Sequence, residues 1–284
     1  MGSKMKIGDY EITALETGRF ALDGGAMFGV VPKVIWNKKN PADELNRIDL
    51  ALRVLLLEGN GRRILIDTGI GHKLPDKYAK IYGIDHELYS LEGALKSKGL
   101  TPDDISDVIL THLHFDHAGG ATRFEGDAIV PSFKNAQYYI QQANLDWAQN
   151  PTEKDKASYL PENFEPLMAS GQLKTIQGAG EILPFIHAWT TDGHTIGQQL
   201  ILIKDDTQAL LYAADIIPTA THLAVPYVMG YDLQPLLTIA EKKKILRQAV
   251  DQNWVIVFEH DPNMAACTVQ DSPKGIVFKE AIEL

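Results

Sequence analysis

The sequence predicts a mixed α/β protein in which two β-sheets pack against each other and helices cover their outer faces. Apolar, strand-like segments dominate the chain, and in each half they precede the helical segments instead of alternating with them as in a Rossmann fold. No stretch has the composition of a linker or of a low-complexity tract. We therefore expect the 284 residues, 45% hydrophobic and 23% charged, to form one globular domain over residues 1–284.

The first half contains clear turn and capping signals. The apolar run at 51–57 is followed by Gly59-Asn60-Gly61, a sequence typical of a hairpin turn. Ser90 and Gly99 have the positions of an N-cap and a C-terminal stop around a helical segment. The expected elements are strands over 10–17, 51–57 and 64–66, a helix over 91–98, a capped helical start at 101–104 and a buried strand over 108–110.

The second half repeats this mixture of strands and helices. Its clearest helix covers 236–252, where one mostly apolar face is expected to contain Leu236, Ile239, Lys243, Leu246 and Val250. The other expected elements are strands over 136–140, 186–191, 200–203, 209–214 and 255–258 and helices over 141–149 and 162–170.

Charge and composition exclude several classes of partner. The net charge of −10 argues against nucleic acid, because binding a phosphate backbone requires a basic surface. The single cysteine, Cys267, permits neither an intramolecular disulfide nor a cysteine-based zinc site, and we expect it to be a small core residue. The beginning of the chain has no signal-peptide pattern, and no apolar run approaches the ~18 residues of a membrane span. We expect a cytoplasmic protein that does not bind membranes.

A cluster of histidines is the most informative segment. His112, His114, Asp116 and His117 fall within six residues, directly after an apolar strand. In an extended backbone the first three would point to one side, and a tight turn would bring His117 beside them. Gly119 and Gly120 would then allow a sharp turn after the cluster. Imidazole and carboxylate are the usual ligands of a cation such as zinc, so the cluster predicts a metal site.

Three further candidate ligands each follow a buried strand. His194 comes after the run at 186–191, Asp215 after the run at 210–214, and His260 after the run at 255–258. Loops at one edge of a rigid sheet are where sites are usually assembled. We therefore expect these three residues to join the cluster at 112–117.

The motif His112-x-His114-x-Asp116-His117, followed by His194, Asp215 and His260, resembles the metallo-β-lactamase superfamily. Asp67, in Ile66-Asp67-Thr68-Gly69, is similar to an early structural aspartate of that family. The resemblance implies an αββα sandwich with a metal site at one edge of its sheets. It also implies two metal ions, the first held by His112, His114 and His194 and the second by Asp116, His117 and His260. Asp215 and a hydroxide would bridge the two ions.

Within the superfamily, the chain looks most like the lactonase, organophosphate-hydrolase and glyoxalase-II-like branches. The antibiotic-degrading enzymes with a cysteine ligand fit less well, because Asp215 occupies that position. The flavodiiron proteins also fit less well, because they carry Glu where His114 stands and append a flavin domain. The negative net charge disfavours the RNA-processing members. Glu259 precedes His260 where the lactonase branch often has glycine.

The resemblance implies a dinuclear metal-dependent hydrolase in which a bridging hydroxide attacks the carbonyl of a lactone or related ester. Zinc is the expected metal, with Fe, Mn, Co or Ni as alternatives, and Asp116 is expected to carry a proton to the leaving group. Hydrolysis of a thioester or a phosphotriester is the alternative activity. A ligand-binding or sensor protein with vestigial activity is the alternative from another class of function.

Two regions are candidates for contact with the substrate. Either His222 or Tyr227, after Asp215, is expected to donate a hydrogen bond to the developing oxyanion, with a packing role as the alternative. Tyr227 and Met229 line a pocket or belong to the core. The apolar segment 20–36 is either a buried hairpin or a flap or subunit contact, which would allow a homodimer. An apolar rim favours neutral, partly hydrophobic small molecules.

Overall fold

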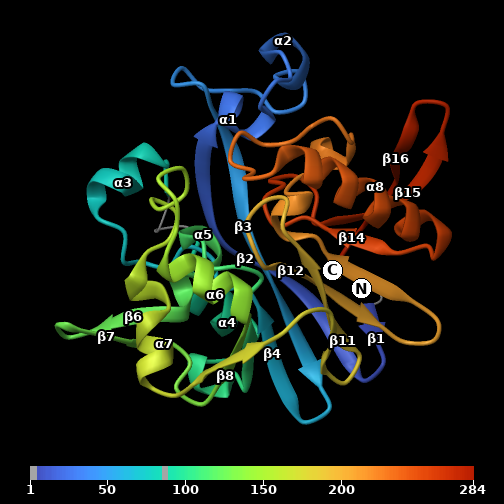
Figure 1. Ribbon diagram of the computed structural model, residues 1–284. Helices are drawn as coiled ribbons and strands as arrows, with labels where there is room; N and C mark the ends of the chain where they lie inside the picture. The colour runs from blue at the N-terminus through green and yellow to red at the C-terminus, as the bar shows by residue number, and fades with distance from the viewer. Residues whose placement is uncertain (1–4, 85–88) are drawn as a thin grey trace.

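Two seven-stranded β-sheets form the centre of the protein, as a computed structural model describing residues 5–84 and 89–284 shows (Figure 1). The first sheet has the order β1-β2-β3-β4-β5-β8-β9, and the second has the order β10 to β16. Both sheets are mixed, because parallel pairs join β4, β5, β8 and β9 in the first and β13 and β14 in the second. The predicted fold class, two packed mixed sheets with helices outside, is confirmed.

The strands follow one another almost in chain order. The first sheet contains β1 (Met5–Ile7), β2 (Tyr10–Asp23), β3 (Arg47–Gly59), β4 (Arg62–Ile66), β5 (Asp107–Ile109), β8 (Gln137–Gln141) and β9 (Leu173–Ile176). The second contains β10 (Gly180–Leu183), β11 (Ile186–Thr191), β12 (Gln198–Lys204), β13 (Ala209–Tyr212), β14 (Val255–Val257), β15 (Ala266–Ser272) and β16 (Gly275–Ile282). A separate hairpin pairs β6 (Thr122–Glu125) with β7 (Ala128–Pro131).

The helices lie outside the sheets, and several are short (Figure 1). Their bounds are α1 (Gly24–Phe28), α2 (Lys33–Trp36), α3 (Asp76–Ile81), α4 (Leu91–Ser97), α5 (Phe115–Ala118), α6 (Gln142–Gln149), α7 (Glu165–Ala169) and α8 (Pro235–Asp251). Single 3₁₀ turns are η1 (Pro102–Asp104), η2 (Gly119–Ala121), η3 (Pro161–Asn163), η4 (Ala214–Ile216) and η5 (Ala220–Leu223). None of the helices in the described part of the chain is both long and apolar enough to cross a membrane.

The hydrophobic core lies between the two sheets and under the helices on their outer faces. Side chains of β3 and β4 face those of β12, β13 and β14 between the sheets, and α8 packs on the second sheet through Ile245 and Leu246. Leu95 of α4 and Leu145 of α6 cover the outer face of the first sheet. Cys267 is fully buried in this core, as expected of a core residue. These layers hold the strand ends rigidly at the edge where the site forms.

The turn and the helix cap predicted from short sequence patterns are present in the structure. Asn60 and Gly61 adopt φ values of 53° and 71°, which is the backbone of a two-residue hairpin turn. The Ser90 hydroxyl accepts a hydrogen bond from the Gly93 amide at 3.0 Å and caps α4. Gly99 follows that helix with φ of 74°. The turn and the cap are confirmed.

The segment 20–36 is neither a hairpin nor uniformly buried. Its first residues continue β2, and Asp23 caps α1 by accepting a hydrogen bond from the Ala26 amide. The rings of Phe28 and Trp36 stack in a buried position, whereas Val30 and Val34 are 89% and 76% exposed. The hairpin interpretation is wrong, because the cap begins a helix where the apolar pattern alone indicated a strand.

Two helix predictions need correction. The expected helix over 162–170 is interrupted at Phe164, between η3 and α7. The buried face of α8 is rotated from the predicted one, since Leu236 is 82% exposed and Lys243 is exposed, whereas Lys242 is fully buried. Lys242 occupies a core-facing position because its ammonium donates to the carbonyl oxygens of Ala224 and Tyr227.

Candidate metal centre

The histidine-rich segment leaves β5 and enters the short helix α5. His112 and His114 lie in the extended stretch before that helix, whereas Asp116 and His117 lie within it. The predicted extended run therefore ends one ligand early, and the helical turn of α5 brings Asp116 and His117 toward the histidines. All four side chains are buried.

Gly119 and Gly120 have a role that differs from the predicted sharp turn. Gly119 has an ordinary helical φ of −61°. A Cβ on Gly119 would lie 2.1 Å from the Ile70 carbonyl oxygen, and one on Gly120 would lie 2.2 Å from that of Thr68. The two glycines thus allow η2, which directly follows α5, to pack closely against the backbone that follows β4.

The other three predicted ligands come from the second sheet. His194 lies between β11 and β12, Asp215 lies in η4 after β13, and His260 follows β14. Each strand ends at the same edge of the sandwich, so the loops converge on α5. The structure brings all seven predicted residues together in two groups.

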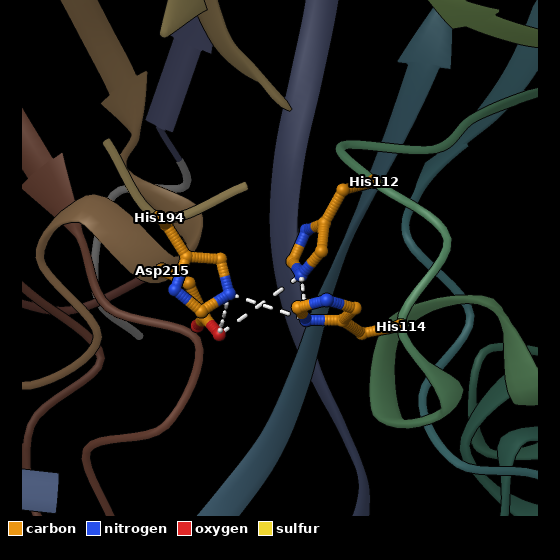
Figure 2. Close-up of side chains that lie close together, drawn as sticks. All are labelled: His112, His114, His194 and Asp215. Carbon is orange, nitrogen blue, oxygen red and sulfur yellow. Dashed lines mark hydrogen bonds and ion pairs between the residues drawn. The ribbon is translucent and has the colours of Figure 1, made fainter. Parts of the chain in front are cut away.

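The first group consists of His112, His114, His194 and Asp215 (Figure 2). His114 Nδ1 lies 3.0 Å from His112 Nε2 and 3.2 Å from His194 Nε2. His194 Nε2 is 3.1 Å from Asp215 Oδ2, and His112 Nε2 is 4.0 Å from the same oxygen. Four donor atoms from both halves of the chain therefore point at one another.

The second group consists of Asp116, His117 and His260. The Nε2 atoms of His117 and His260 are 3.3 Å apart and lie 3.8 and 3.7 Å from Asp116 Oδ2. Asp215 contacts this group as well, with Oδ2 3.5 Å from His117 Nε2 and Oδ1 3.2 Å from His260 Nε2. The Asp215 carboxylate thus contacts histidines of both groups.

The far ring nitrogens of four of the five histidines are held by a second set of residues, whereas the buried Nε2 of His114 has no hydrogen-bond partner among the described residues. His112 Nδ1 lies 3.1 Å from the Thr111 hydroxyl, and His260 Nδ1 lies 2.9 Å from the Ala51 carbonyl oxygen. Such contacts fix the tautomer and the ring orientation that a metal requires. Thr111 directly precedes His112, and Ala51 lies in β3, beside the backbone of His260. No sequence motif predicts either contact.

Carboxylates hold two of the histidines. Asp232 Oδ1 lies 3.0 Å from His194 Nδ1, and Asp67 Oδ2 lies 3.1 Å from His117 Nδ1. Asp67 is also fixed by two hydrogen bonds of 2.7 Å from the amide and hydroxyl of Thr111. Asp67 therefore has the structural position that the resemblance implied. Asp232 was missed, because it lies in an irregular loop 38 residues after His194.

The electrostatics of the cluster are those of a cation site. Burial holds the pKa values of His112 and His114 well below the usual range, which keeps the rings in the neutral, ligating form. Burial also opposes the charged form of His260, but Asp215 outweighs it and raises the pKa of His260 to about 9. The buried carboxylates thus attract positive charge, which a metal ion would supply in place of the protons.

The donor atoms fit a metal better than they fit one another. His114 Nδ1 faces two ring nitrogens, and a single proton satisfies only one of those contacts. Within the described residues, the buried Asp215 Oδ1 accepts no hydrogen bond of normal geometry. Neutral imidazoles with carboxylates are a donor set typical of divalent transition metals.

A cavity of about 250 Å³ opens above the cluster. His114, Asp116, His194, Asp215 and His260 line its floor. Its walls contain apolar and phenolic side chains, namely Leu22, Met27, Phe115, Met229, Tyr82 and Tyr231. Met229 was a predicted pocket residue, whereas the two tyrosines belong to loops without any motif.

His222 and Tyr227 lie away from this floor. His222 Nδ1 is 2.7 Å from the Thr219 hydroxyl and Nε2 is 2.8 Å from the Met27 carbonyl oxygen, and the ring stacks on Phe28. Burial lowers the pKa of His222 to about 3. Tyr227 packs edge-on against Phe28. Neither residue is among the cavity-lining side chains. Their surroundings match the packing role that was the alternative to donating a hydrogen bond to the substrate.

Comparison with known proteins gives the family. The sequence model of the Metallo-beta-lactamase superfamily matches residues 52–260, a span that includes every predicted ligand. The chain belongs to the metallo-β-lactamase superfamily. Membership and the converging His and Asp donors together identify a metal-dependent hydrolase that binds divalent metal ions.

Its relatives include named lactonases. An N-acyl homoserine lactonase from a Bacillus species is 28% identical over 227 residues, which cover 75% of this chain and 82% of that protein. The N-acyl homoserine lactonase AttM of Rhizobium radiobacter is 24% identical over 178 residues, which cover 60% of this chain and 63% of that protein.

Solved structures agree with the fold over nearly the whole chain. A probable metal-dependent hydrolase from Staphylococcus aureus superposes with a TM-score of 0.88 at 33% identity, covering 98% of this chain and all of that one. AidC, a dizinc quorum-quenching lactonase, superposes with a TM-score of 0.82 at 23% identity, covering 99% and 98%. At that identity the second likeness supports the fold alone.

Proposed function

We propose that this protein hydrolyses neutral lactones that carry an apolar substituent, with two divalent ions, zinc by preference, in its centre. The observation that carries the proposal is the sorting of seven donors into two groups that both contact Asp215, on the floor of a cavity whose walls include several apolar side chains. His112, His114 and His194 would hold one ion, and Asp116, His117 and His260 the other. The relatives named as N-acyl homoserine lactonases support the choice of substrate.

The bound ions would supply Lewis acidity and a water activated at neutral pH. The protein's own contribution begins with Asp116, whose carboxylate lines the cavity beside His117 and His260. From this position it can take up a proton and deliver it to the leaving oxygen when the ring opens. Asp232 and Asp67 keep His194 and His117 in the orientation that this chemistry needs.

Tyr82 and Tyr231 are better placed than His222 or Tyr227 to orient the substrate. Both line the cavity, and Tyr82 stacks on Phe115 at 5.1 Å between ring centroids. Burial, with the nearby Asp116 charge, raises the pKa of Tyr82, and burial raises that of Tyr231. The two phenols therefore stay protonated at neutral pH and can donate to a carbonyl oxygen.

A second hollow of about 530 Å³ adjoins the first and has room for a substituent. The two share Leu22, Tyr82 and Tyr231. The rest of the second hollow has an apolar part and a charged part, formed by Ala21, Leu45 and Ile81 and by Asp23, Arg47 and Lys80. An apolar group attached to the ring would leave water on entering it, which favours binding in proportion to its buried area. A polar ring at the donors and an apolar tail against Leu22, Leu45 and Ile81 would match these parts of the two hollows.

The test is turnover of the zinc-loaded protein on a panel of lactones with acyl tails of increasing length, thioesters and aryl phosphotriesters. We expect the highest kcat/KM for a lactone with a tail, and a lower KM as the tail lengthens. The protein stripped by a chelator is the control. Faster turnover of thioesters or phosphotriesters would replace the proposal with that alternative. Binding of lactones without turnover would favour the sensor alternative.

A further inference from the structure

Glu259 is a fully buried carboxylate that neither the family motif nor the seven donors include. Its Oε2 lies 2.9 Å from Nδ1 of His117, on the side of the ring opposite the site. Asp67 Oδ2 approaches the same nitrogen at 3.1 Å. His117 therefore has two buried carboxylates behind it, whereas His112 has a hydroxyl and His260 a backbone carbonyl.

The two carboxylates are in different situations. Asp67 receives both the amide and the hydroxyl of Thr111, so its charge is well solvated by protein dipoles. Neither oxygen of Glu259 has a hydrogen-bond partner of normal geometry among the described residues. When Nε2 of His117 faces a cation, Nδ1 carries a single hydrogen, and one carboxylate at a time accepts it. The carboxyl group of Glu259 is thus directed at His117, and a cation bound by His117 would favour the charged form of this carboxyl group.

The loop geometry keeps Glu259 in this place. The Glu259 carbonyl oxygen accepts a hydrogen bond from the Arg53 amide at 3.1 Å, and the buried Arg53 guanidinium donates to the carbonyl oxygens of Phe258 and Asp261 on either side. These contacts anchor the backbone between β14 and His260 to β3. The side chain at 259 is consequently turned inward, toward His117.

We propose that Glu259 is a positioning residue that strengthens cation binding by the Asp116, His117 and His260 group, selectively over the His112, His114 and His194 group. A buried negative charge behind a ligand makes that ligand more basic and attracts the cation through a medium of low dielectric constant. This inference rests on the proposed function, because it requires two ions per chain.

The test is zinc titration of the metal-free, full-length protein against a chromophoric chelator, which resolves a tighter and a weaker dissociation constant. In Glu259→Gln the side chain keeps its size and an acceptor oxygen but loses its charge. We expect one of the two constants to weaken by about 10–100-fold, the range for loss of such outer partners, while the other stays within about twofold. In a protein that already carries His117→Ala, Glu259→Gln should cause no further selective weakening of zinc binding.

The matched control is Glu241→Gln. Glu241 accepts hydrogen bonds from the Asp192 and Gly193 amides beside His194 but touches none of the seven donors. The Glu241→Gln variant should leave the ratio of the weaker to the tighter zinc dissociation constant unchanged. Glu259→Met, which also removes the charge and fills the same space, should reproduce the selective loss and replaces the glutamine variant if that one does not fold.

Three results would overturn the inference. Unchanged constants in both variants at 259 would mean that the charge has no influence on the cation. Equal weakening of both ions would mean that Glu259 supports the fold as a whole. A wild-type protein that takes up fewer than two ions would overturn this inference and the two-ion form of the proposed function together, whereas two ions with unchanged variants would overturn the inference alone.

Discussion

At the scale of single residues, the centre depends on buried carboxylates with distinct surroundings. Asp215 lies between the two groups of histidines, Asp116 lies at the cavity floor, and Asp67 and Asp232 stand behind ligands. In the proposed function the same chemical group would serve as donor, as proton carrier or as support, depending on what it touches. Asp116 lines the cavity, and we propose for it the second task of carrying a proton.

Asp116→Asn should lower turnover much more than it lowers metal content. The amide still offers an oxygen to a cation, but it cannot accept and release a proton. We expect kcat to fall by about 10²–10⁴-fold, the usual contribution of a general acid–base group, with the metal content near that of the wild type. Measuring kcat and elemental content on the same preparation checks this. Wild-type turnover with full metal would show that Asp116 is only a ligand.

At the scale of elements, α8 shows how tertiary contacts select the face of a helix. Its buried residues are Thr238, Lys242, Ile245, Leu246 and Ala249, and the apolar Leu236 at its start is exposed. The helix packs on the second sheet and also holds the loop of η5 through Lys242. Its stability contribution is therefore concentrated on one face.

Leu246→Ala should destabilise the fold by about 2–5 kcal/mol, because it removes apolar atoms from the layer between α8 and the sheet. Leu236→Ala, on the exposed end of the same helix, should change the free energy of unfolding by no more than about 0.5 kcal/mol. Urea unfolding of the metal-free proteins measures both. Equal losses for the two variants would contradict the observed face.

Lys242 should make stability rise with pH. Burial lowers its pKa to about 7 in the fold, against the opposing effect of Asp232, from an ordinary value of 10.5. Between these values the unfolded chain holds a proton that the folded protein has released, so the unfolding free energy increases with pH, by at most about 1.4 kcal/mol per pH unit. Lys242→Met should lose this increase.

Urea unfolding from pH 7 to 10 measures the difference between wild type and Lys242→Met. The control is Lys243→Met, since Lys243 is exposed on the adjacent position of the helix. Its stability should change with pH in parallel with that of the wild type. If the curve for Lys242→Met is also parallel, the buried ammonium keeps an ordinary pKa in the folded protein.

At the scale of the whole molecule, the site joins the two halves of the chain. His112, His114, Asp116 and His117 follow the first sheet, and His194, Asp215 and His260 follow strands of the second. Lys154 adds a link across the cavity by donating to the carbonyl oxygens of Gly230, Tyr231 and Asp232. A cation bound by both halves would therefore stabilise their packing.

We expect about two divalent ions per chain, and chelation should lower the unfolding temperature because the ions bind only the folded protein. Asp215→Ala removes the carboxylate that both groups contact and should reduce the ion content. Elemental analysis of protein purified without chelator, with thermal unfolding before and after chelation, measures these effects. A single firmly bound ion that Asp215→Ala leaves unchanged would contradict the two-ion centre.

The sequence by itself determined the fold class, the turn at Asn60, the cap at Ser90 and the residues that gather in the centre. These features depend on local backbone preferences, or on ligands that each follow a strand, so their signals lie within a few consecutive residues. The order of the histidines and aspartates along the chain also indicated the family.

Only the tertiary structure decided which residues surround that centre and which face each helix buries. Asp232 and Glu259 reach the histidines through loops, and Tyr82 and Tyr231 both line the cavity. His222 turns into the core, where the Met27 carbonyl oxygen accepts a hydrogen bond from Nε2 and the Thr219 hydroxyl donates one to Nδ1. Lys242 is buried because backbone carbonyls from another segment receive its ammonium. Such contacts join residues far apart in the chain, and no local pattern contains their energy.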